Sequence, residues 1–271
     1  MHWVDLDGAV NVRDLGGLPT DDGRQTATGR LLRSDNLQDL TAADVRRLVG
    51  DIGVTTVVDL RATAELTAEG PAPLDAVPGV RHAHHPLTPE TVSAPDLAAE
   101  ALLLRREQER TRFPGDPIIG RYLGYLDYRP DQVVGAVRSI AHDPGAAIVH
   151  CAAGRDRTGV VVALALTAAG VRPEAVIADY TATGDRAEAI LDRIRRSQTY
   201  NWDVDSMPPE RYRPRPETMA AFLEQLTASY GGASGWLAGN GLRPDELDLL
   251  RAKLRQPPEP RPAREAVARR G

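Results

Sequence analysis

One stretch of this sequence restricts the fold more than any other part of the chain. Residues 146–150 form a short apolar run typical of a buried strand, and residues 158–169 form an apolar helix-length stretch that ends at Gly170. Between them the chain reads His-Cys-Ala-Ala-Gly-Arg-Asp-Arg-Thr-Gly, residues 150–159. A buried strand that passes through a short loop into a helix predicts a parallel α/β sheet.

The loop has the composition of an anion-binding cradle. Its backbone amides can point inward and continue into the helix N-terminus, and Gly154 relieves the steric strain of that curvature. Arg157, six positions after Cys151, can return over the loop and grip two phosphoryl oxygens. Cys151 then lies at the base of the loop, in a positive field that favours its thiolate. The predicted phosphate-binding residues are Ala152, Ala153, Gly154, Arg155, Asp156, Arg157 and Thr158.

A thiolate below a bound phosphate is positioned for in-line attack on phosphorus. The attack would form a phosphocysteine on Cys151, which water then hydrolyses. The Thr158 hydroxyl is suited to stabilise the departing thiolate, and His150 is expected to bond to neighbouring backbone and order the loop. A nucleotide-binding loop is rejected because Gly154 is not followed by Gly-Lys, and a rhodanese-type sulfur transferase does not require the Arg-Thr-Gly ending.

The composition excludes other uses of the thiol. Cys151 is the only cysteine among 271 residues, so the chain can form neither an internal disulfide nor a cysteine-rich zinc site. A net charge of −5 indicates no basic surface for nucleic acid, so anion binding must be local. The N-terminus lacks a signal-peptide pattern, and the longest apolar stretch, residues 160–171, is too short to cross a membrane. We therefore expect a cytoplasmic protein without membrane insertion or a nucleic-acid partner.

Patterns elsewhere extend the α/β prediction. The β-branched run at residues 54–60 is typical of a strand buried on both faces, and residues 30–34 and 80–86 are weaker strand candidates. Thr41 is placed to cap a helix that continues through Leu48. Further helices are expected over residues 98–112, 118–128, 131–142, 217–230 and 244–254. We expect one domain over residues 1–255 and a disordered, proline-rich tail over residues 256–271.

The loop matches the Cys-x5-Arg signature of protein tyrosine phosphatases in its extended form, His-Cys-x-x-Gly-x-x-Arg-Thr-Gly. The chain as a whole resembles the atypical bacterial tyrosine phosphatases over about residues 8–255. The matching segments are residues 11–17, 32–35, 56–61, the Cys151 loop, and the closing stretch from 230–232 to 241–242.

The resemblance implies a central, mostly parallel sheet flanked by helices, with a helical lid after the loop at about residues 185–216. It implies activity on phosphotyrosine, extending in some members to phosphoserine, phosphothreonine or phosphoinositides, with no metal and no organic cofactor. The lid segment carries Tyr200, Trp202, Met207 and Tyr212, which would either contact substrate from a mobile cover or pack toward the core.

Two aspartates compete for the role of general acid, which must protonate the leaving oxygen. The resembled branch implicates an aspartate inside the loop, and Asp156 occupies that position. Asp59 is the rival, because it lies near the C-terminal end of a predicted central strand, where α/β active sites open. Asp59 would otherwise orient Arg157 or a loop amide. We favour Asp156 and keep Asp59 as the alternative.

Two loop positions depart from the family pattern. Ala152 stands where a bulky aromatic residue is frequent, and Arg155 stands where lysine is frequent. Arg155 would contact a second anionic group of the substrate or remain a solvated surface charge. Arg13, Arg33 and Arg61 could add positive charge near the mouth, but structural ion pairs are the favoured interpretation.

His82, His84 and His85 resemble a metal-binding cluster, with His82 and His84 on one face of a predicted strand. No cysteine or carboxylate set completes the site, so a role without metal is favoured.

The sequence therefore predicts a cysteine-dependent phosphomonoester hydrolase, a tyrosine phosphatase acting on phosphorylated substrates. The first alternative is a phosphatase of a metabolite, nucleotide-like or inositol phosphate that uses the same loop. The second is a pseudophosphatase that binds phosphorylated partners without turnover, and the intact Cys151, Asp156 and Arg157 argue against it.

Overall fold

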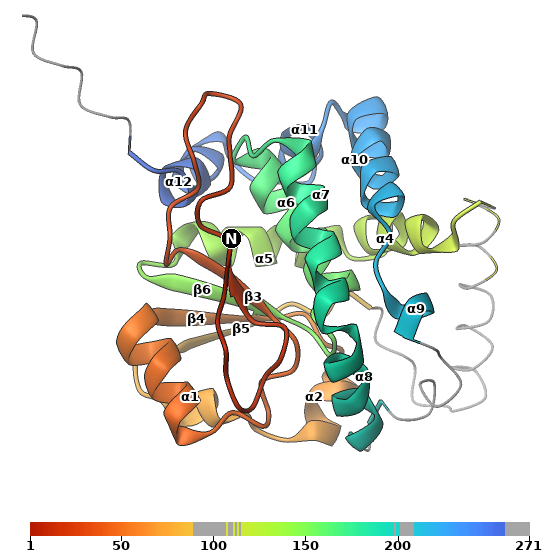
Figure 1. The fold of residues 1–271 in the computed structure, drawn as a ribbon. Coiled ribbons are helices and arrows are strands. Elements are labelled where there is room, and N and C mark those ends of the chain that lie inside the picture. Colours follow the sequence, from red (N-terminus) through yellow and green to blue (C-terminus); the bar gives the residue numbers. More distant parts are fainter. Residues whose placement is uncertain are drawn as a thin grey trace, which may run out of the picture.

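A computed structural model describes residues 1–88, 107, 111, 113, 115–197, 199–200 and 209–257. Its central sheet has the strand order β1-β2-β3-β6-β4-β5 (Figure 1). The strands are β1 (His2–Trp3), β2 (Arg13–Asp14), β3 (Leu31–Ser34), β4 (Val54–Asp59), β5 (Arg81–His84) and β6 (Ala146–His150). Strands β3, β6, β4 and β5 are parallel, and β1 and β2 add an antiparallel edge. The predicted α/β class with a mostly parallel sheet is confirmed.

Helices cover both faces of the sheet. The α-helices are α1 (Ala42–Arg46), α2 (Thr63–Glu69), α4 (Pro117–Tyr128), α5 (Pro130–His142), α6 (Asp156–Ala168), α7 (Pro173–Ala182), α8 (Ala187–Arg196), α9 (Pro209–Tyr212), α10 (Pro216–Tyr230), α11 (Ala233–Gly239) and α12 (Pro244–Leu254). The other helical segments are the π-helix η1 (Arg47–Ile52) and the 3-10 helices η2 (Pro73–Ala76) and η3 (Thr183–Arg186). In Figure 1, α5, α6, α11 and α12 lie above the sheet, and α1 and α2 lie below it.

Side chains of the central strands point alternately to the two faces of the sheet, and a different hydrophobic cluster lies on each face. Val58 and Val149 pack with the large cluster that includes side chains of α4, α5, α6, α7, α10, α11 and α12, whereas the preceding Val57 and Ile148 pack with a smaller cluster beside α1 and η2. Successive side chains of a strand point to opposite faces, so a strand covered by helices on both sides must be apolar throughout. This requirement explains the β-branched run that predicted β4 and the apolar run that predicted β6.

Most predicted boundaries agree with the structure. Thr41 caps α1, because its hydroxyl accepts from the Asp44 amide while the Asp44 carboxylate accepts from the Thr41 amide. The helix after the cysteine loop begins at Asp156, two residues before its predicted start. The predicted helix over residues 98–112 lies almost entirely outside the described residues, as does the predicted tail from residue 258 onward.

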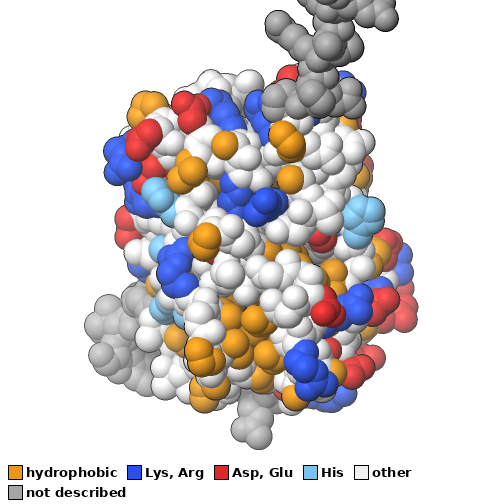
Figure 2. Space-filling model, turned by 90° about the vertical axis from the view of Figure 1, so that its left-hand side faces the viewer, with side chains coloured by type: hydrophobic (Ala, Val, Ile, Leu, Met, Phe, Trp, Pro, Cys, Tyr) orange, Lys and Arg blue, Asp and Glu red, His pale blue; other side chains and the backbone are white. Residues whose placement is uncertain are grey.

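One molecular face shows how charge is distributed over part of the surface. Figure 2 presents the side that lies at the left of Figure 1, where acidic and basic side chains are intermixed around a hydrophobic patch in the lower half. No continuous basic surface covers this face. The mixed charge agrees with anion binding through a local site.

A buried ion pair between Lys253 and Asp143 joins α12 to the loop before β6. The Lys253 ammonium group donates to the Asp143 carboxylate at 2.8 Å, and their side chains are 6% and 0% exposed. Thr55 and Thr56 also donate to this carboxylate.

We predict that Lys253→Met lowers the free energy of unfolding by about 3–5 kcal/mol, because it leaves the Asp143 charge buried without its cation. Urea unfolding followed by circular dichroism measures the change. The double variant Lys253→Met/Asp143→Asn should recover a substantial part of the loss. An unfolding free energy unchanged in the single variant would contradict the importance of this pair.

Candidate active site

The cysteine loop lies at the C-terminal end of β6, the strand between β3 and β4. Cys151 is a free thiol, only 3% exposed, at the corner where the strand ends. Strand registry places His150 beside Ser34 on one side and Asp59 on the other. The C-terminal ends of three parallel strands therefore lie next to one another beside the thiol.

Gly154 is required by the shape of the loop. Its φ of +66° lies in the left-handed region, which disfavours other residues. A Cβ at this position would also lie 2.4 Å from the Ser34 carbonyl oxygen, so the loop approaches the end of β3 too closely for a side chain. After this glycine the chain enters α6, whose first backbone amides have no partner within the helix.

Buried side chains hold the outer edge of the loop. Arg33 donates to the Gly154 carbonyl at 2.6 Å and to Asp179 Oδ2 at 2.5 Å, while Asn11 donates to the Ala153 carbonyl at 3.0 Å. Arg13 donates to the other Asp179 oxygen at 2.7 Å. Carbonyls that are bound from outside leave the amides of the same loop free to turn inward.

Asp179 forms ion pairs with two buried arginines at once. Burial would raise the pKa of Asp179, but the guanidinium groups of Arg13 and Arg33 hold it below its ordinary value. Burial lowers the pKa of Arg13 to about 10 despite this partner. Both arginines are fully buried, so the favoured interpretation as structural ion pairs is confirmed for them.

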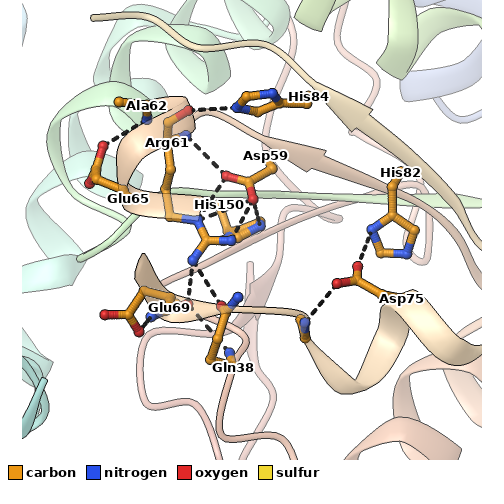
Figure 3. Close-up of polar contacts among 12 residues, drawn as sticks. Gln38, Asp59, Arg61, Ala62, Glu65, Glu69, Asp75, His82, His84 and His150 are labelled. Carbon is orange, nitrogen blue, oxygen red and sulfur yellow. Dashed lines mark hydrogen bonds and ion pairs between the residues drawn. The ribbon is translucent and has the colours of Figure 1, made fainter. Parts of the chain in front are cut away.

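Arg157 is held in a two-pronged ion pair by Glu65, in the first turn of α2. The two guanidinium nitrogens donate to the two carboxylate oxygens at 2.5 and 2.9 Å. Burial would raise the pKa of Glu65, but Arg157 lowers it. Glu65 also accepts from the Ala62 amide at 2.7 Å (Figure 3). The sequence did not predict a role for Glu65. The usual pattern at a helix start is Ser/Thr-x-x-Glu, and this chain has Ala62 in place of the serine or threonine.

Asp156 is surrounded by hydrogen-bond donors. The Tyr122 hydroxyl donates to Asp156 Oδ1 at 2.6 Å, and Arg155 forms an ion pair with its Oδ2 at 3.0 Å. Burial would raise the pKa of Asp156, but Arg155, Arg121 and the Tyr122 hydrogen bond bring it to about 2. The carboxylate is therefore ionised in the absence of substrate.

Arg155 is also bound on its other side. It donates to the Tyr212 carbonyl at 2.6 Å, and its guanidinium carbon lies 4.1 Å from the centre of the Tyr212 ring. The Arg155 side chain is thus neither a solvated surface charge nor a free cation in this arrangement. Tyr212 itself is buried with Ile190 and Leu191, which favours the core-directed interpretation for this aromatic residue.

Asp59 faces Arg61 and His150 (Figure 3). Arg61 donates to both oxygens of Asp59, the shortest contact being 2.6 Å, and His150 Nε2 lies 3.5 Å from Asp59 Oδ2. Burial would raise the pKa of Asp59, but His150 and Arg61 hold it well below its ordinary value. Arg61 therefore forms a structural ion pair, which is the interpretation favoured from the sequence. The prediction that the His150 ring bonds to neighbouring backbone is wrong. The register of β4 and β6 places His150 beside Asp59, and the ring contacts the Asp59 carboxylate.

The Thr158 hydroxyl is fully buried and makes no hydrogen bond within the described part of the chain. A buried hydroxyl without a partner is unusual and calls for an explanation.

The three histidines near β5 have separate partners. His82 contacts Asp75 at 2.8 Å, His84 Nε2 lies 2.9 Å from the Arg61 carbonyl oxygen, and His85 contacts Ser139 (Figure 3 shows the first two). Among the described residues, no three histidine, cysteine or acidic side chains gather where a metal ion could bind.

The predicted lid segment is described in part. Helix α8 is tied to the body by Arg193, which contacts Asp35 at 3.2 Å and donates to the Asn36 carbonyl at 3.1 Å. Tyr200 lines a cavity beside Ala152. Trp202 and Met207 lie outside the described residues. No helix in the described portion of the chain has the length and apolarity needed to cross a membrane.

Comparison with known proteins matches nearly the whole chain. A family model described as "Tyrosine phosphatase family" matches residues 4–256. The chain is 28% identical to the protein named "Triple specificity protein phosphatase PtpB" of Mycobacterium tuberculosis, over 92% of this chain and 98% of that protein. It is 28% identical to a "Tyrosine-protein phosphatase" of Nostoc commune, over 83% of this chain and 74% of that protein. A relative from Cupriavidus necator is 29% identical over 94% of this chain and 87% of its own length.

We predict that Asp179→Ala lowers the free energy of unfolding by about 3–5 kcal/mol, because Arg13 and Arg33 then lose their common buried counter-charge. Glu174→Ala on the same helix is the control, since Glu174 is exposed and its loss should change stability by less than about 1 kcal/mol. Urea unfolding of both variants measures the difference. Equal stability of the two variants would show that the paired arginines do not depend on Asp179.

Proposed function

Because the chain belongs to the tyrosine phosphatase family, whose members are phosphoric monoester hydrolases, we propose that it hydrolyses phosphotyrosine through a phosphocysteine on Cys151. The observation that carries this proposal is the position of the buried thiol at the end of β6, at the base of a loop whose arginine is held by Glu65. The catalytic domain corresponds to residues 1–255, in agreement with the extent of the family match.

The substrate phosphoryl group lies in the loop. The inward amides of residues 152–158 bind its oxygens, and Arg157 grips two of them from the side. Glu65 fixes the plane of the Arg157 guanidinium group, so less conformational freedom is lost when the phosphate arrives. Glu65 is thus a positioning residue for Arg157.

The first chemical step transfers the phosphoryl group to sulfur. The Cys151 thiolate attacks phosphorus, an S–P bond forms, and the bond from phosphorus to the tyrosyl oxygen breaks. Asp156 takes up a proton from solvent when the phosphate dianion binds beside it, and this proton passes to the leaving phenoxide. In the second step water attacks phosphorus, Asp156 accepts a proton from that water, the S–P bond breaks, and inorganic phosphate leaves.

We assign the acid to Asp156 and a positioning role to Asp59. Both carboxylates are engaged, Asp59 by Arg61 and His150 and Asp156 by Arg155 and Tyr122, so the assignment rests on their positions. Asp156 lies within the loop itself, and a bound phosphate dianion beside it favours the protonated carboxyl through like-charge repulsion. Asp59 then orients His150, the neighbour of Cys151.

The unpartnered Thr158 hydroxyl supports the second step. A hydroxyl that no described residue uses can donate to the thiolate when the S–P bond breaks. Its burial strengthens such a hydrogen bond, since the local dielectric constant is low.

The direct test of this proposal is Cys151→Ser. Hydrolysis of para-nitrophenyl phosphate should fall by about 10⁴-fold or more, while affinity for inorganic phosphate is retained, because the loop amides and Arg157 remain. Steady-state kinetics and isothermal titration measure the two effects, and circular dichroism checks the fold. Turnover that survives in the variant would exclude a phosphocysteine.

A second prediction separates the two aspartates by leaving group. Asp156→Asn should depress kcat for phenyl phosphate, whose leaving group needs a proton, by about 10²-fold or more, and affect para-nitrophenyl phosphate less. Asp59→Asn should affect both substrates alike. The reverse pattern would identify Asp59 as the acid.

A third prediction concerns pH. Removal of the Tyr122 hydroxyl in Tyr122→Phe takes away a donor that favours ionised Asp156, so the pKa of Asp156 rises. The acid must be protonated to act, so the alkaline limb of the kcat profile for phenyl phosphate should move to higher pH. Tyr128→Phe, at an exposed tyrosine of the same helix, is the control. An alkaline limb that does not move would show that Tyr122 does not act on the acid.

A further inference from the structure

A cavity opens directly beside the phosphate-binding loop. Its volume is about 590 Å³, and its walls come from the N-terminal segment, the loop after β3, the end of α2 and helix α8. Ala152, the residue after the catalytic cysteine, lines it, and the small alanine side chain leaves the cavity open to the loop. A group attached to the phosphorylated side chain can therefore extend into this space.

Acidic side chains outnumber basic ones in the cavity wall. The charged lining residues are Asp7, Asp35, Asp39, Glu69, Arg193 and Arg196. Arg193 is already paired with Asp35 at 3.2 Å and with Asp39 at 3.1 Å. The wall therefore retains an excess of negative charge.

Glu69 is the carboxylate of this wall that is best placed to bind a cation. It accepts from Ser197 Oγ at 2.7 Å and from Asn36 Nδ2 at 3.0 Å, and both of these donors are uncharged. The two hydrogen bonds fix the carboxylate in position and leave its charge available to a cation.

The loop arginine that could receive a second anion is occupied. Arg155 is bound by Asp156 on one side and by the carbonyl and ring of Tyr212 on the other. A second phosphate on the substrate would therefore meet an Arg155 that is already paired, and a cavity wall in which four acidic residues outnumber the two arginines, Arg193 and Arg196. Like charges brought together in this way oppose binding.

We propose that the cavity receives a lysine or arginine side chain adjacent to phosphotyrosine in a peptide substrate, and that Glu69 sets this preference. The inference rests on the proposed function and names the substrate class of the same site. The proposed preference for a cationic side chain disfavours nucleotides and multiply phosphorylated inositols as substrates, because they bring additional negative charge to the cavity wall.

Three phosphotyrosine peptides that differ only in the neighbouring residue test the proposal: lysine, glutamine or glutamate. At low ionic strength kcat/KM should decrease in that order, with about a tenfold ratio between the lysine and glutamate peptides that narrows as salt is added. Equal values for the three peptides, or a preference for the glutamate peptide, would overturn the proposal.

Glu69→Gln keeps the size of the side chain and removes its charge, and it replaces one acceptor oxygen by an amide nitrogen that can donate to the Ser197 hydroxyl. The lysine-to-glutamate ratio should fall to about threefold or less, while kcat/KM for para-nitrophenyl phosphate stays unchanged, because that substrate has no group in the cavity. Glu224→Gln, at an exposed glutamate on α10, is the matched control and should keep the ratio. A ratio that Glu69→Gln leaves intact would overturn the role of Glu69.

Ala152→Phe provides an independent reading, because the larger side chain occupies the mouth of the cavity. The lysine-to-glutamate ratio should approach one in this variant, whatever the overall rate, and an unaltered ratio would place the discriminating contact elsewhere. Failure of the proposed function is distinguishable from failure of this inference. In the first case no phosphotyrosine peptide is hydrolysed, and in the second all three are hydrolysed alike.

Discussion

The arrangement of this site depends on a loop whose carbonyls are bound from outside by buried side chains. Arg33 joins the Gly154 carbonyl to Asp179, and Asn11 binds the neighbouring Ala153 carbonyl. A buried guanidinium group is costly unless a nearby negative charge is paired with it. Asp179 supplies that charge to Arg33 and Arg13 together, so a single carboxylate on α7 connects the loop with two strands of the sheet.

The sequence predicts what is local. A continuous segment containing Cys151 and Arg157 implies the end of β6, the loop and the start of α6, because neighbours in the chain determine these features. The contacts that complete the site join residues far apart in the sequence, and no local pattern predicts them. Glu65 meets Arg157 across 92 positions, and Asp179 meets Arg33 across 146. The sequence predicts Asp59 as a candidate from its place at the end of a strand. Its contact with the His150 ring depends on the register between β4 and β6, which the sequence does not predict.

Charge in the site is balanced before substrate arrives. Arg157 is paired with Glu65, and Arg155 with Asp156. The chain has a net charge of −5, so long-range attraction contributes little to the capture of a phosphate. In the proposed mechanism, affinity for phosphate then comes from the loop amides and from Arg157, whose orientation Glu65 fixes. In our proposal the acidic cavity beside Ala152 then affects the choice of substrate, because both Arg155 and Arg157 of the loop are already paired with carboxylates.

The central claim is that Cys151 carries the phosphoryl group between two chemical steps. Rapid acid quenching during turnover of an aryl phosphate, followed by peptide mass spectrometry, tests it most directly. The account predicts a transient mass increase of one phosphoryl group on the peptide that contains Cys151, accumulating more in Asp156→Asn when the leaving group needs no proton. Steady turnover with no phosphorylated Cys151 peptide at any quench time, in either protein, would contradict it.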